Sequence, residues 1–271
     1  MRVLSICLLA LVSLLGACGS SRTTFARYPG SPPAFDRSKS SPEALAIVDK
    51  VLEAAGGVAT WEKVKQIRWT QAKIENGNTT ARGEQAWDRW NARHWGKKDG
   101  DEGATVVAYE IYGTYATSYV EKANGKKQII DGPDKGRAVG YAKTAFQLDV
   151  TPMFIHFLLV EPGANVASGG IVRDGETEYD QLDVSFGDGD TAHHDLVYRV
   201  IIDKTTHLVK RVDIEKRSTM ERVGYELSDW TDVGGLKFPA TRKNLGSQEV
   251  SKASDIKIGS PQDELFMTPL L

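Results

Sequence analysis

The sequence predicts a mainly β protein of the α+β class, built on a single curved antiparallel sheet with an N-terminal helix and one buried apolar helix. Three observations support this fold class. About a dozen segments alternate apolar and polar residues and are separated by turn residues. One capped amphipathic pattern precedes them, and one short segment in the middle of the chain is apolar almost all round. The length of 271 residues permits a single domain.

The chain begins with the pattern of a targeting segment. Arg2 provides a positive charge, and the apolar stretch 3–15 is too short to span a bilayer as a helix. The residues Leu15-Gly16-Ala17-Cys18 resemble the lipobox of bacterial lipoproteins. That resemblance implies a signal peptide at 1–17, cleavage before Cys18, and an anchor in the membrane through lipid on Cys18. The alternative is an ordinary signal peptide with a cysteine nearby.

Residues 18–40 are predicted to be a lipidated cysteine and a flexible tether. The segment has no apolar period and is rich in Gly, Ser, Thr and Pro. Gly19 follows the candidate lipidated cysteine, where an Asp commonly retains Gram-negative lipoproteins in the inner membrane. By that resemblance we expect an outer-membrane lipoprotein that faces the periplasm.

The folded domain is expected to span residues 41–271 and to open with a helix at 41–55. Ser41 suits the N-cap and Pro42 the first helical position, and the apolar residues that follow repeat on one face. The Gly56-Gly57 pair ends this helix. A second short helical turn follows and contains Trp61.

Alternation and turn residues then predict two groups of antiparallel strands. An irregular stretch and the apolar helix separate the groups, and a last helical turn is possible at 263–266. The first group is expected at 66–75, 79–95, 104–112, 115–122 and 126–131, and the second at 165–172, 177–187, 194–203, 207–217, 221–228, 236–243 and 248–258.

The apolar helix is expected to begin at Thr151-Pro152 and to end before Pro162-Gly163. A short helix without a polar face must be buried on nearly every side, either as a permanent plug or as a movable lid over a ligand. Its one polar side chain, His156, is interpreted as a hydrogen-bonded core histidine. The candidate ligand-contacting residues are Met153, Phe154, Phe157 and Leu158.

Charge and cysteine content narrow the function classes. The formal net charge is -2 and the basic residues are scattered or in pairs, so nucleic acid is not expected as a partner. The only cysteines are Cys7, inside the targeting segment, and Cys18, so no disulfide is expected. The sequence contains none of the common catalytic or phosphate-binding motifs, and we expect no cofactor and no enzymatic activity.

Two further groups of residues are candidate sites. The loop 188–195 collects three carboxylates and two histidines, which are metal-ligand types, but we interpret it as a hairpin turn with exposed histidines and expect no metal site. The second group is Trp87, Arg89, Arg93 and Trp95, which simple alternation would place on one face of a strand. These residues form either a cavity rim for a lipid head group or an aromatic core with a solvated Arg pair.

The order of the predicted elements resembles the LolA/LolB/LppX superfamily of periplasmic lipoprotein and lipid carriers. The resemblance rests on the helix that ends in Gly56-Gly57 before Trp61, on the strand 198–203 that leads through a turn into 205–209, and on the segment 234–239. It implies an incomplete β-barrel around an apolar cavity that accepts acyl chains. The tight, polar Asn76-Gly77 turn differs from the exposed apolar hairpin tip of LolB, which argues against lipoprotein insertion.

The leading interpretation is therefore a non-catalytic outer-membrane lipoprotein that binds an acyl chain or another apolar ligand, a lipid or a lipoprotein, in the concavity of its sheet. One alternative is a structural or interaction lipoprotein of the cell envelope, whose helix fills the concavity permanently. Another is a hydrolase whose site is dispersed over distant strands. A large empty cavity would favour the first interpretation, and a filled one the second.

Overall fold

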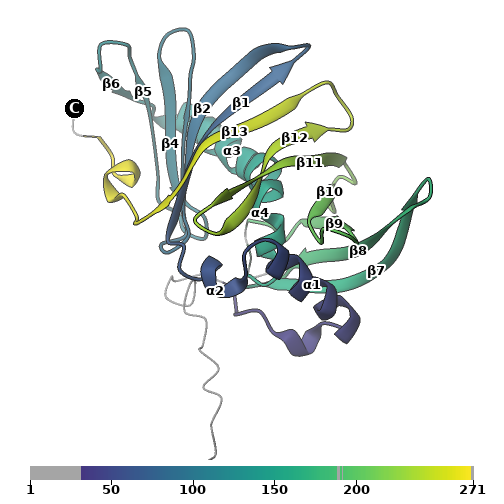
Figure 1. Cartoon of the computed structure of the whole chain (residues 1–271). Coiled ribbons are helices and arrows are strands. Elements are labelled where there is room, and N and C mark those ends of the chain that lie inside the picture. Colours follow the sequence, from purple (N-terminus) through teal and green to yellow (C-terminus); the bar gives the residue numbers. More distant parts are fainter. Residues whose placement is uncertain (1–31, 188–189, 191, 270–271) are drawn as a thin grey trace, which may run out of the picture.

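A single antiparallel sheet of 13 strands curves around a helical connection in the computed structural model (Figure 1), which describes residues 32–187, 190 and 192–269. The spatial order of the strands is β6-β5-β4-β3-β2-β1-β13-β12-β11-β10-β9-β8-β7. Strands β6 and β7 are the two edges, so the sheet stays open. The predicted fold class is confirmed.

The sheet consists of two meanders that meet where the first and last strands pair, with Gln66 opposite Gly259. Within each meander every strand pairs with its neighbours in sequence, as the predicted hairpins require. The first meander contains β1 (Gln66–Glu75), β2 (Asn78–Asp88), β3 (Arg93–Lys98), β4 (Ala104–Glu110), β5 (Ala116–Glu121) and β6 (Lys127–Ile129). The second contains β7 (Ala164–Asp174), β8 (Thr177–Phe186), β9 (Leu196–Asp203), β10 (Val209–Lys216), β11 (Arg222–Val233), β12 (Leu236–Asn244) and β13 (Val250–Gly259).

The segment predicted as one strand at 79–95 forms two strands. Residues 89–92 leave the sheet in a tight turn, in which Ala92 has a positive φ of 49°. Asp88 holds this turn because its carboxylate accepts hydrogen bonds from the backbone N–H and the side chain of Asn91, at 3.0 and 2.9 Å. Neither glycine nor proline marks the turn, so the alternation appeared continuous in the sequence.

Helix α1 (Pro42–Ala54) forms as predicted. The hydroxyl of Ser41 accepts a hydrogen bond from the N–H of Ala44 at 3.2 Å, and Val48, Val51 and Leu52 bury one face. The short helix α2 (Val58–Trp61) follows directly. Both helices lie at the end of the curved sheet where β7 and β8 are found (Figure 1), and α1 contacts both of those strands.

Residues 32–40 pack on the domain, although the sequence predicts a flexible tether as far as residue 40. The carbonyl of Pro33 accepts a hydrogen bond from the N–H of Gly163 at 2.8 Å, and Phe35 packs against the main core. Arg37, in a 3-10 turn, donates twice to the carboxylate of Asp49 in α1, at 3.0 and 2.8 Å. An apolar side chain and a bidentate ion pair therefore bring this segment onto the folded surface. Cys18 and residues 1–17 lie outside the described residues.

One continuous helical stretch of 27 residues connects β6 to β7, the two edges of the sheet. It contains helix α3 (Gly132–Ala145), a π-helical turn (Phe146–Val150) and helix α4 (Thr151–Leu158). The part before Thr151 is a correction, because the sequence pattern predicts an irregular stretch there. Pro152 explains the π-helical turn, since a proline removes a helical N–H and crowds the carbonyl of the preceding turn.

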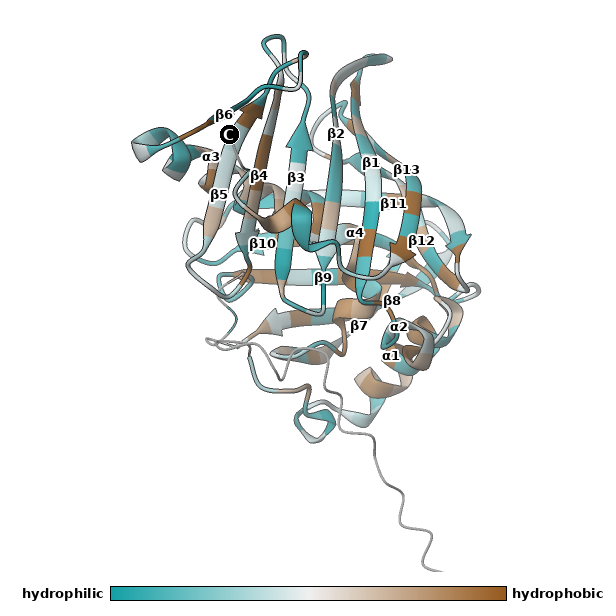
Figure 2. Ribbon diagram, turned by 90° about the vertical axis from the view of Figure 1, so that its left-hand side faces the viewer, coloured by the Kyte–Doolittle hydropathy of each residue, from teal (hydrophilic) through white to brown (hydrophobic). Residues whose placement is uncertain are grey.

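Two hydrophobic clusters pack on opposite faces of the sheet. The main core lies on the concave side, where α1, α4 and the inner faces of both meanders meet. The smaller cluster lies on the convex side of β2 to β5 and contains Trp95, Val106, Tyr119 and Phe266. Phe266 belongs to the predicted final helical turn, Asp263–Phe266, which contacts β3 and β4; Figure 2 views this side.

No helix among the described residues has both the length and the apolar character needed to cross a membrane.

Candidate functional site

Helix α4 fills one half of the concave face with aromatic side chains. Phe157 stacks on Trp61 with ring centroids 4.1 Å apart and planes 9° from parallel. Phe154 meets Trp69 edge-on at 5.4 Å and lies 5.2 Å from the ring of Trp87. Both phenylalanines are completely buried. This half of the concavity is a packed protein core.

The four side chains predicted to contact a ligand all belong to this packed half. Met153, Phe154, Phe157 and Leu158 are at most 5% exposed. Met153 and Leu158 border cavities of only about 10 Å³, which is about the room that one water molecule needs. The structure therefore favours the plug over the lid for this helix, and a ligand contact at these residues stays a prediction.

A buried ion pair holds the C-terminal end of α4. The carboxylate of Glu161 pairs with Arg89 and accepts a hydrogen bond from Trp61 Nε1 at 2.6 Å. Arg89 also donates to the carbonyls of Trp61 and Val64, at 2.9 and 2.8 Å, and its guanidinium lies 3.6 Å from the centre of the Trp61 ring. Arg89 therefore joins α2, the turn after β2 and the segment after α4, rather than facing a lipid head group.

The other three residues of the predicted head-group rim, Trp87, Arg93 and Trp95, do not form a rim either. Trp87 lies in the main core, whereas Trp95 lies in the convex cluster, because the turn at 89–92 breaks the alternation. Arg93 pairs with Asp88 and with Asp263, both at 2.5 Å. The structure does not bring the four residues together on one strand face.

A hydrogen-bonded chain at the start of α4 resembles a catalytic triad in its connectivity. Asp190 Oδ2 lies 2.9 Å from His193 Nδ1, and His193 Nε2 lies 3.1 Å from the hydroxyl of Thr151. All three side chains are buried, and the adjoining cavity holds about 10 Å³. This array has no room for a substrate, and it attaches the loop before β9 to helix α4. His193 is buried, contrary to the predicted exposed turn; Asp188 lies outside the described residues.

The core interpretation of His156 is confirmed. Its Nε2–H donates to the carbonyl of Lys237 at 3.1 Å, and the ring is completely buried. Burial lowers the pKa of His156 to about 3, so the ring is neutral at physiological pH.

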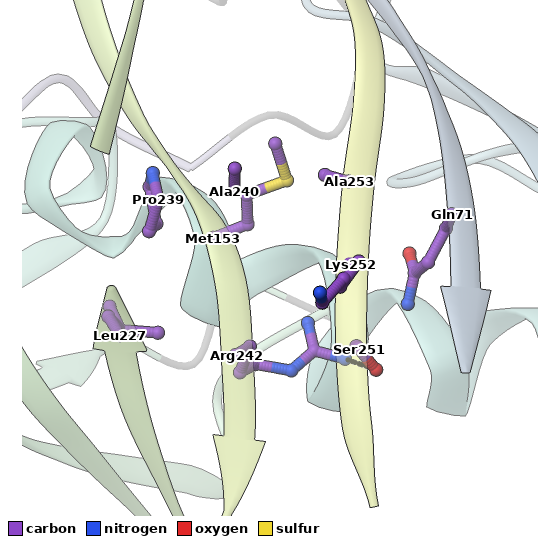
Figure 3. A pocket seen from close by; sticks show the side chains of 9 residues that line it. All are labelled: Gln71, Met153, Leu227, Pro239, Ala240, Arg242, Ser251, Lys252 and Ala253. Carbon is purple, nitrogen blue, oxygen red and sulfur yellow. Dashed lines mark hydrogen bonds between the residues drawn. The ribbon is translucent and has the colours of Figure 1, made fainter. Parts of the chain in front are cut away.

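A polar network lies between the two halves of the concave face, at the π-helical turn. Arg242 donates to the carboxylate of Asp149 at 2.6 Å and to the hydroxyl of Ser251 at 3.0 Å. Lys73 lies 3.2 Å from the same carboxylate and 3.4 Å from that of Glu249. Figure 3 shows Arg242 and Ser251 beside a small cavity lined also by Met153. These contacts fix the turn to β1, β12 and β13.

The other half of the concave face contains a cavity of about 800 Å³ beneath helix α3. Its walls are strands β1 to β4 and helix α3, and apolar atoms contribute most of the lining surface although many lining residues are polar or charged. The residues that line it are Gln71, Lys73, Ala81, Arg82, Gly83, Gln85, His94, Gly96, Lys97, Lys98, Thr105, Val107, Ile130, Asp134, Arg137, Ala138, Tyr141, Ala142, Ala145 and Asp149.

Small and polar residues form the inner end of this cavity. Gly96, opposite Gln85 and Val107 in the strand register, contributes no side chain. His94 is 2% exposed, and neither of its ring nitrogens has a hydrogen-bond partner among the described residues; Gln85 Oε1 is also buried without one there. Burial lowers the pKa of His94 to about 3, so a neutral imidazole faces the cavity. An occupant with a hydrogen-bonding group would satisfy these atoms.

Helix α3 covers the cavity and lies against β4 and β5 with side chains that are at most partly buried. None of its residues is buried, and Tyr141 is 76% exposed although it lines the cavity. Its direct contacts include a long hydrogen bond, 3.5 Å, from the hydroxyl of Tyr109 to the carbonyl of Ala142. Gly136 and Gly140 lie within the helix and weaken it. Helix α3 is therefore the element with the features of a lid.

Sequence reasoning missed this site. A signal was present, because the inner face carries polar and small residues toward the hairpin tips, as at Gln71, Gly83 and Lys98. In a closed core those positions would be apolar. The cover was missed because α3 has no strong apolar period.

Comparisons with known proteins identify the fold only. No family model matches the sequence, and no curated protein matches it. A DUF1329 family protein from Desulfovibrio piger has a similar structure, with a TM-score of 0.51 and 12% identity over 84% of this chain and 98% of that one. A LolA superfamily protein from Nitrosomonas europaea also has a similar structure, with a TM-score of 0.50 and 12% identity over 83% of this chain and 97% of that one. The predicted resemblance is confirmed at the level of the fold.

Proposed function

We propose that this protein is a non-catalytic lipid-binding lipoprotein of the cell envelope, and that it holds the acyl part of its ligand in the cavity beneath α3. The observation that carries the proposal is the cavity of about 800 Å³ on the concave face, within the range of small-molecule sites. The fold shared with a LolA superfamily protein supports the same function.

The two halves of the concave face give this proposal a physical basis. The packed half around α4 supplies the stability of the fold, so the half beneath α3 need not be filled by protein. Each methylene that enters an apolar cavity contributes about 0.8 kcal/mol to binding. The burial of a chain of a dozen carbons thus provides enough binding free energy to offset the free-energy cost of ordering helix α3 above it.

The anchor in this proposal is a lipid on Cys18, which places the domain on the periplasmic side of the outer membrane. The support is the lipobox pattern and the targeting segment at 1–17. Replacing Cys18 with Ala should abolish incorporation of labelled fatty acid and release the protein from the membrane fraction. Unchanged labelling of that variant would contradict the anchor, although not the cavity.

The cavity itself is tested with a neutral amphiphile and a filling mutation. Monoolein should raise the melting temperature of the wild type, because a ligand of the folded state stabilises it. Ala142→Trp places a large side chain in the cavity and should remove this shift. Thr144→Trp, on an exposed position of the same helix that does not line the cavity, is the matched control and should keep it.

Lipid that co-purifies with the protein provides a second measurement. Mass spectrometry should find acyl lipids in the wild type and in Thr144→Trp, and much less in Ala142→Trp. Equal lipid content in all three proteins, together with no stabilisation by monoolein, would exclude this cavity as the binding site. The filled core around α4 would then favour the interaction lipoprotein.

A further inference from the structure

Two polar side chains at the inner end of the cavity beneath α3 have hydrogen-bonding atoms that the protein does not use. His94 on β3 is 2% exposed, and both of its ring nitrogens are unpaired within the part of the chain that the structure describes. Gln85 on β2 is half-buried, and its Oε1 is likewise buried without a partner there. A buried polar group without a partner lowers stability, so such atoms indicate a place that a ligand can complete.

The two side chains lie close together on the concave face. In the register of β2 and β3, His94 is opposite Trp87 and Gly96 is opposite Gln85, so His94 and Gln85 are diagonal neighbours. Diagonal neighbours on one face are about 7 Å apart, and a ligand atom between their side chains can reach both. Gly96 leaves room for the amide, because a Cβ there would lie 3.1 Å from Gln85 Oε1.

Aromatic rings hold the imidazole of His94 without pairing with its nitrogens. The ring centroids of Tyr109 and Phe146 lie 5.5 and 5.1 Å from the centroid of His94. Because burial lowers its pKa to about 3, the ring is neutral, and one nitrogen donates a hydrogen bond while the other accepts one. The last torsion of Gln85 has a broad range, so its amide can turn its oxygen toward the cavity. The pair therefore offers a donor and acceptors but no charge.

The chemistry of the pair favours an uncharged ligand group. Neither an amide nor a neutral imidazole compensates a charge that is removed from water, and such a charge is costly to bury. Two oppositely charged pairs of the lining are already compensated, because Lys73 pairs with Asp149 at 3.2 Å and Arg137 pairs with Asp134 on α3. A hydroxyl is uncharged, and it both donates and accepts, so it matches the pair.

We propose that the cavity selects a hydroxylated acyl chain, whose hydroxyl lies at the inner end and is held between His94 and Gln85. This inference rests on the proposed function, because it specifies the ligand class of the same cavity. The hydroxyl accepts a hydrogen bond from the imidazole N–H and donates one to Gln85 Oε1. The rest of the chain lies along the apolar part of the lining, which includes Val107, Ile130 and Ala142.

The depth of the cavity sets the position of the hydroxyl along the chain. His94 and Lys98 both line the cavity and are four residues apart on β3, about 14 Å at the rise of an antiparallel strand. Lys98 is the last residue of β3 and lies toward the hairpin tip. With its head group at that level, an extended chain brings carbon 12 near His94 and leaves carbon 2 at the opening. The hydroxyl therefore belongs deep in the chain.

The experiment compares three monoacylglycerols of the same head group and chain length by isothermal titration calorimetry below their critical micelle concentrations. The probes are monoolein, its 12-hydroxyoleoyl analogue and its 2-hydroxyoleoyl analogue. We expect the 12-hydroxy chain to bind about tenfold more tightly than the other two. A wholly apolar cavity predicts the opposite sign, because a hydroxyl at carbon 12 would lose water without gaining a partner.

Variants of the two side chains locate the effect. Gln85→Met and His94→Phe should each reduce the preference for the 12-hydroxy chain to about twofold or less, because each removes one partner of the hydroxyl. Gln85→Met changes a half-buried residue and keeps the test decisive if His94→Phe does not fold. The matched controls Gln128→Met and His156→Phe make the same replacements outside the cavity lining and should keep the preference.

The outcomes separate this inference from the proposed function. Equal or weaker binding of the 12-hydroxy chain relative to monoolein would overturn the hydroxyl preference and leave lipid binding intact. An equal gain for the 2-hydroxy chain, or a preference that survives both Gln85→Met and His94→Phe, would overturn the assignment of the hydroxyl to this pair. No binding of any of the three probes would contradict the proposed function itself.

Discussion

Helices α3 and α4 belong to one continuous helical connection, yet they act on the concave face in opposite ways. Around α4 the side chains are large, aromatic and buried, and Phe157 stacks on Trp61 at 4.1 Å. Under α3 the residues are small or polar, no helical residue is buried, and a cavity of about 800 Å³ remains. The contrast teaches that protein side chains fill one half of this concavity and stabilise the fold, whereas the other half keeps an open cavity.

The boundary between the halves is the π-helical turn at 146–150. Its carboxylate, Asp149, is fixed by Arg242 and Lys73, so the turn belongs to the rigid half. Ligand-binding elements are commonly drawn from the least stable parts of a fold. Helix α3 fits that description better than α4, because none of its residues is buried and two glycines lie within it.

The largest expected difference between the halves comes from truncating an aromatic side chain in each. Phe157→Ala should lower the free energy of unfolding by about 3 to 5 kcal/mol, because it empties a packed aromatic site. Tyr141→Ala, on the exposed face of α3, should change it by less than about 0.5 kcal/mol. Urea denaturation measures both. Similar losses in the two variants would show that α3 is as much a part of the core as α4.

Breaking the buried ion pair between Arg89 and Glu161 tests how much it stabilises the half of the concave face around α4. Glu161→Gln should cost about 3 kcal/mol, because it leaves the buried Arg89 charge without its carboxylate. Arg89→Met/Glu161→Gln removes both charges and should recover part of that loss. A double-mutant cycle measured by urea denaturation gives the coupling. A double variant as unstable as the sum of the two single variants would contradict the pairing.

The two buried histidines, His156 in the filled half and His94 beside the cavity, predict an acid-sensitive fold. In the folded state burial lowers the pKa of each to about 3, below the unfolded value near 6.5. Between these values the unfolded chain binds more protons, so stability is fully present above about pH 6.5 and falls as the pH drops toward 3. The slope is about 1.4 kcal/mol per pH unit for each histidine.

The measurement is urea denaturation between pH 7 and 4. His156→Leu should reduce the slope without changing lipid affinity, whereas His94→Leu should reduce the slope and alter lipid affinity as well. Histidines that protonate freely in the folded protein would leave the slope unchanged in both variants, and this would contradict their buried, neutral state.

The smallest expected effect tests whether helix α3 has a low stability of its own. Gly140→Ala should stabilise helix α3 by about 0.5 to 1 kcal/mol, because the added Cβ meets no atom within 4 Å and alanine is the better helix former. Hydrogen exchange should show slower exchange in α3 and unchanged exchange in α4. Faster exchange in α3 would indicate that the glycine serves a packing role.

Much of the fold could be predicted because its signals are local. The alternation in β1 gave its bounds at 66–75, and Ser41 caps α1 as its residue type predicts. The turn at 89–92 was missed because it depends on the carboxylate of Asp88 and has no glycine or proline. Helix α3 was missed because a helix above a cavity has no apolar stripe to bury.

The candidate site was less predictable for a related reason. Residues that line a cavity differ from core residues mainly in what does not pack against them, and sequence spacing contains no such information. The apolar run that includes Phe154 and Phe157 was noticed because it is a core. Gly83 and Lys98 are distant in the sequence, and only the register of β2 and β3 places them opposite each other on the inner face.

The pairing of β1 with β13 has a consequence for how the chain folds. Gln66 meets Gly259 across nearly the whole domain, whereas every other strand pair joins neighbours in sequence. Each meander can therefore form early from local hairpins, but the pairing that joins them requires a long loop closure and comes late. Because β13 is the last of the 13 strands in chain order, the two halves of the sheet cannot be joined until every other strand of the sheet has been synthesised. Until then, the unpaired edge of β1 is exposed to misassembly or to a chaperone.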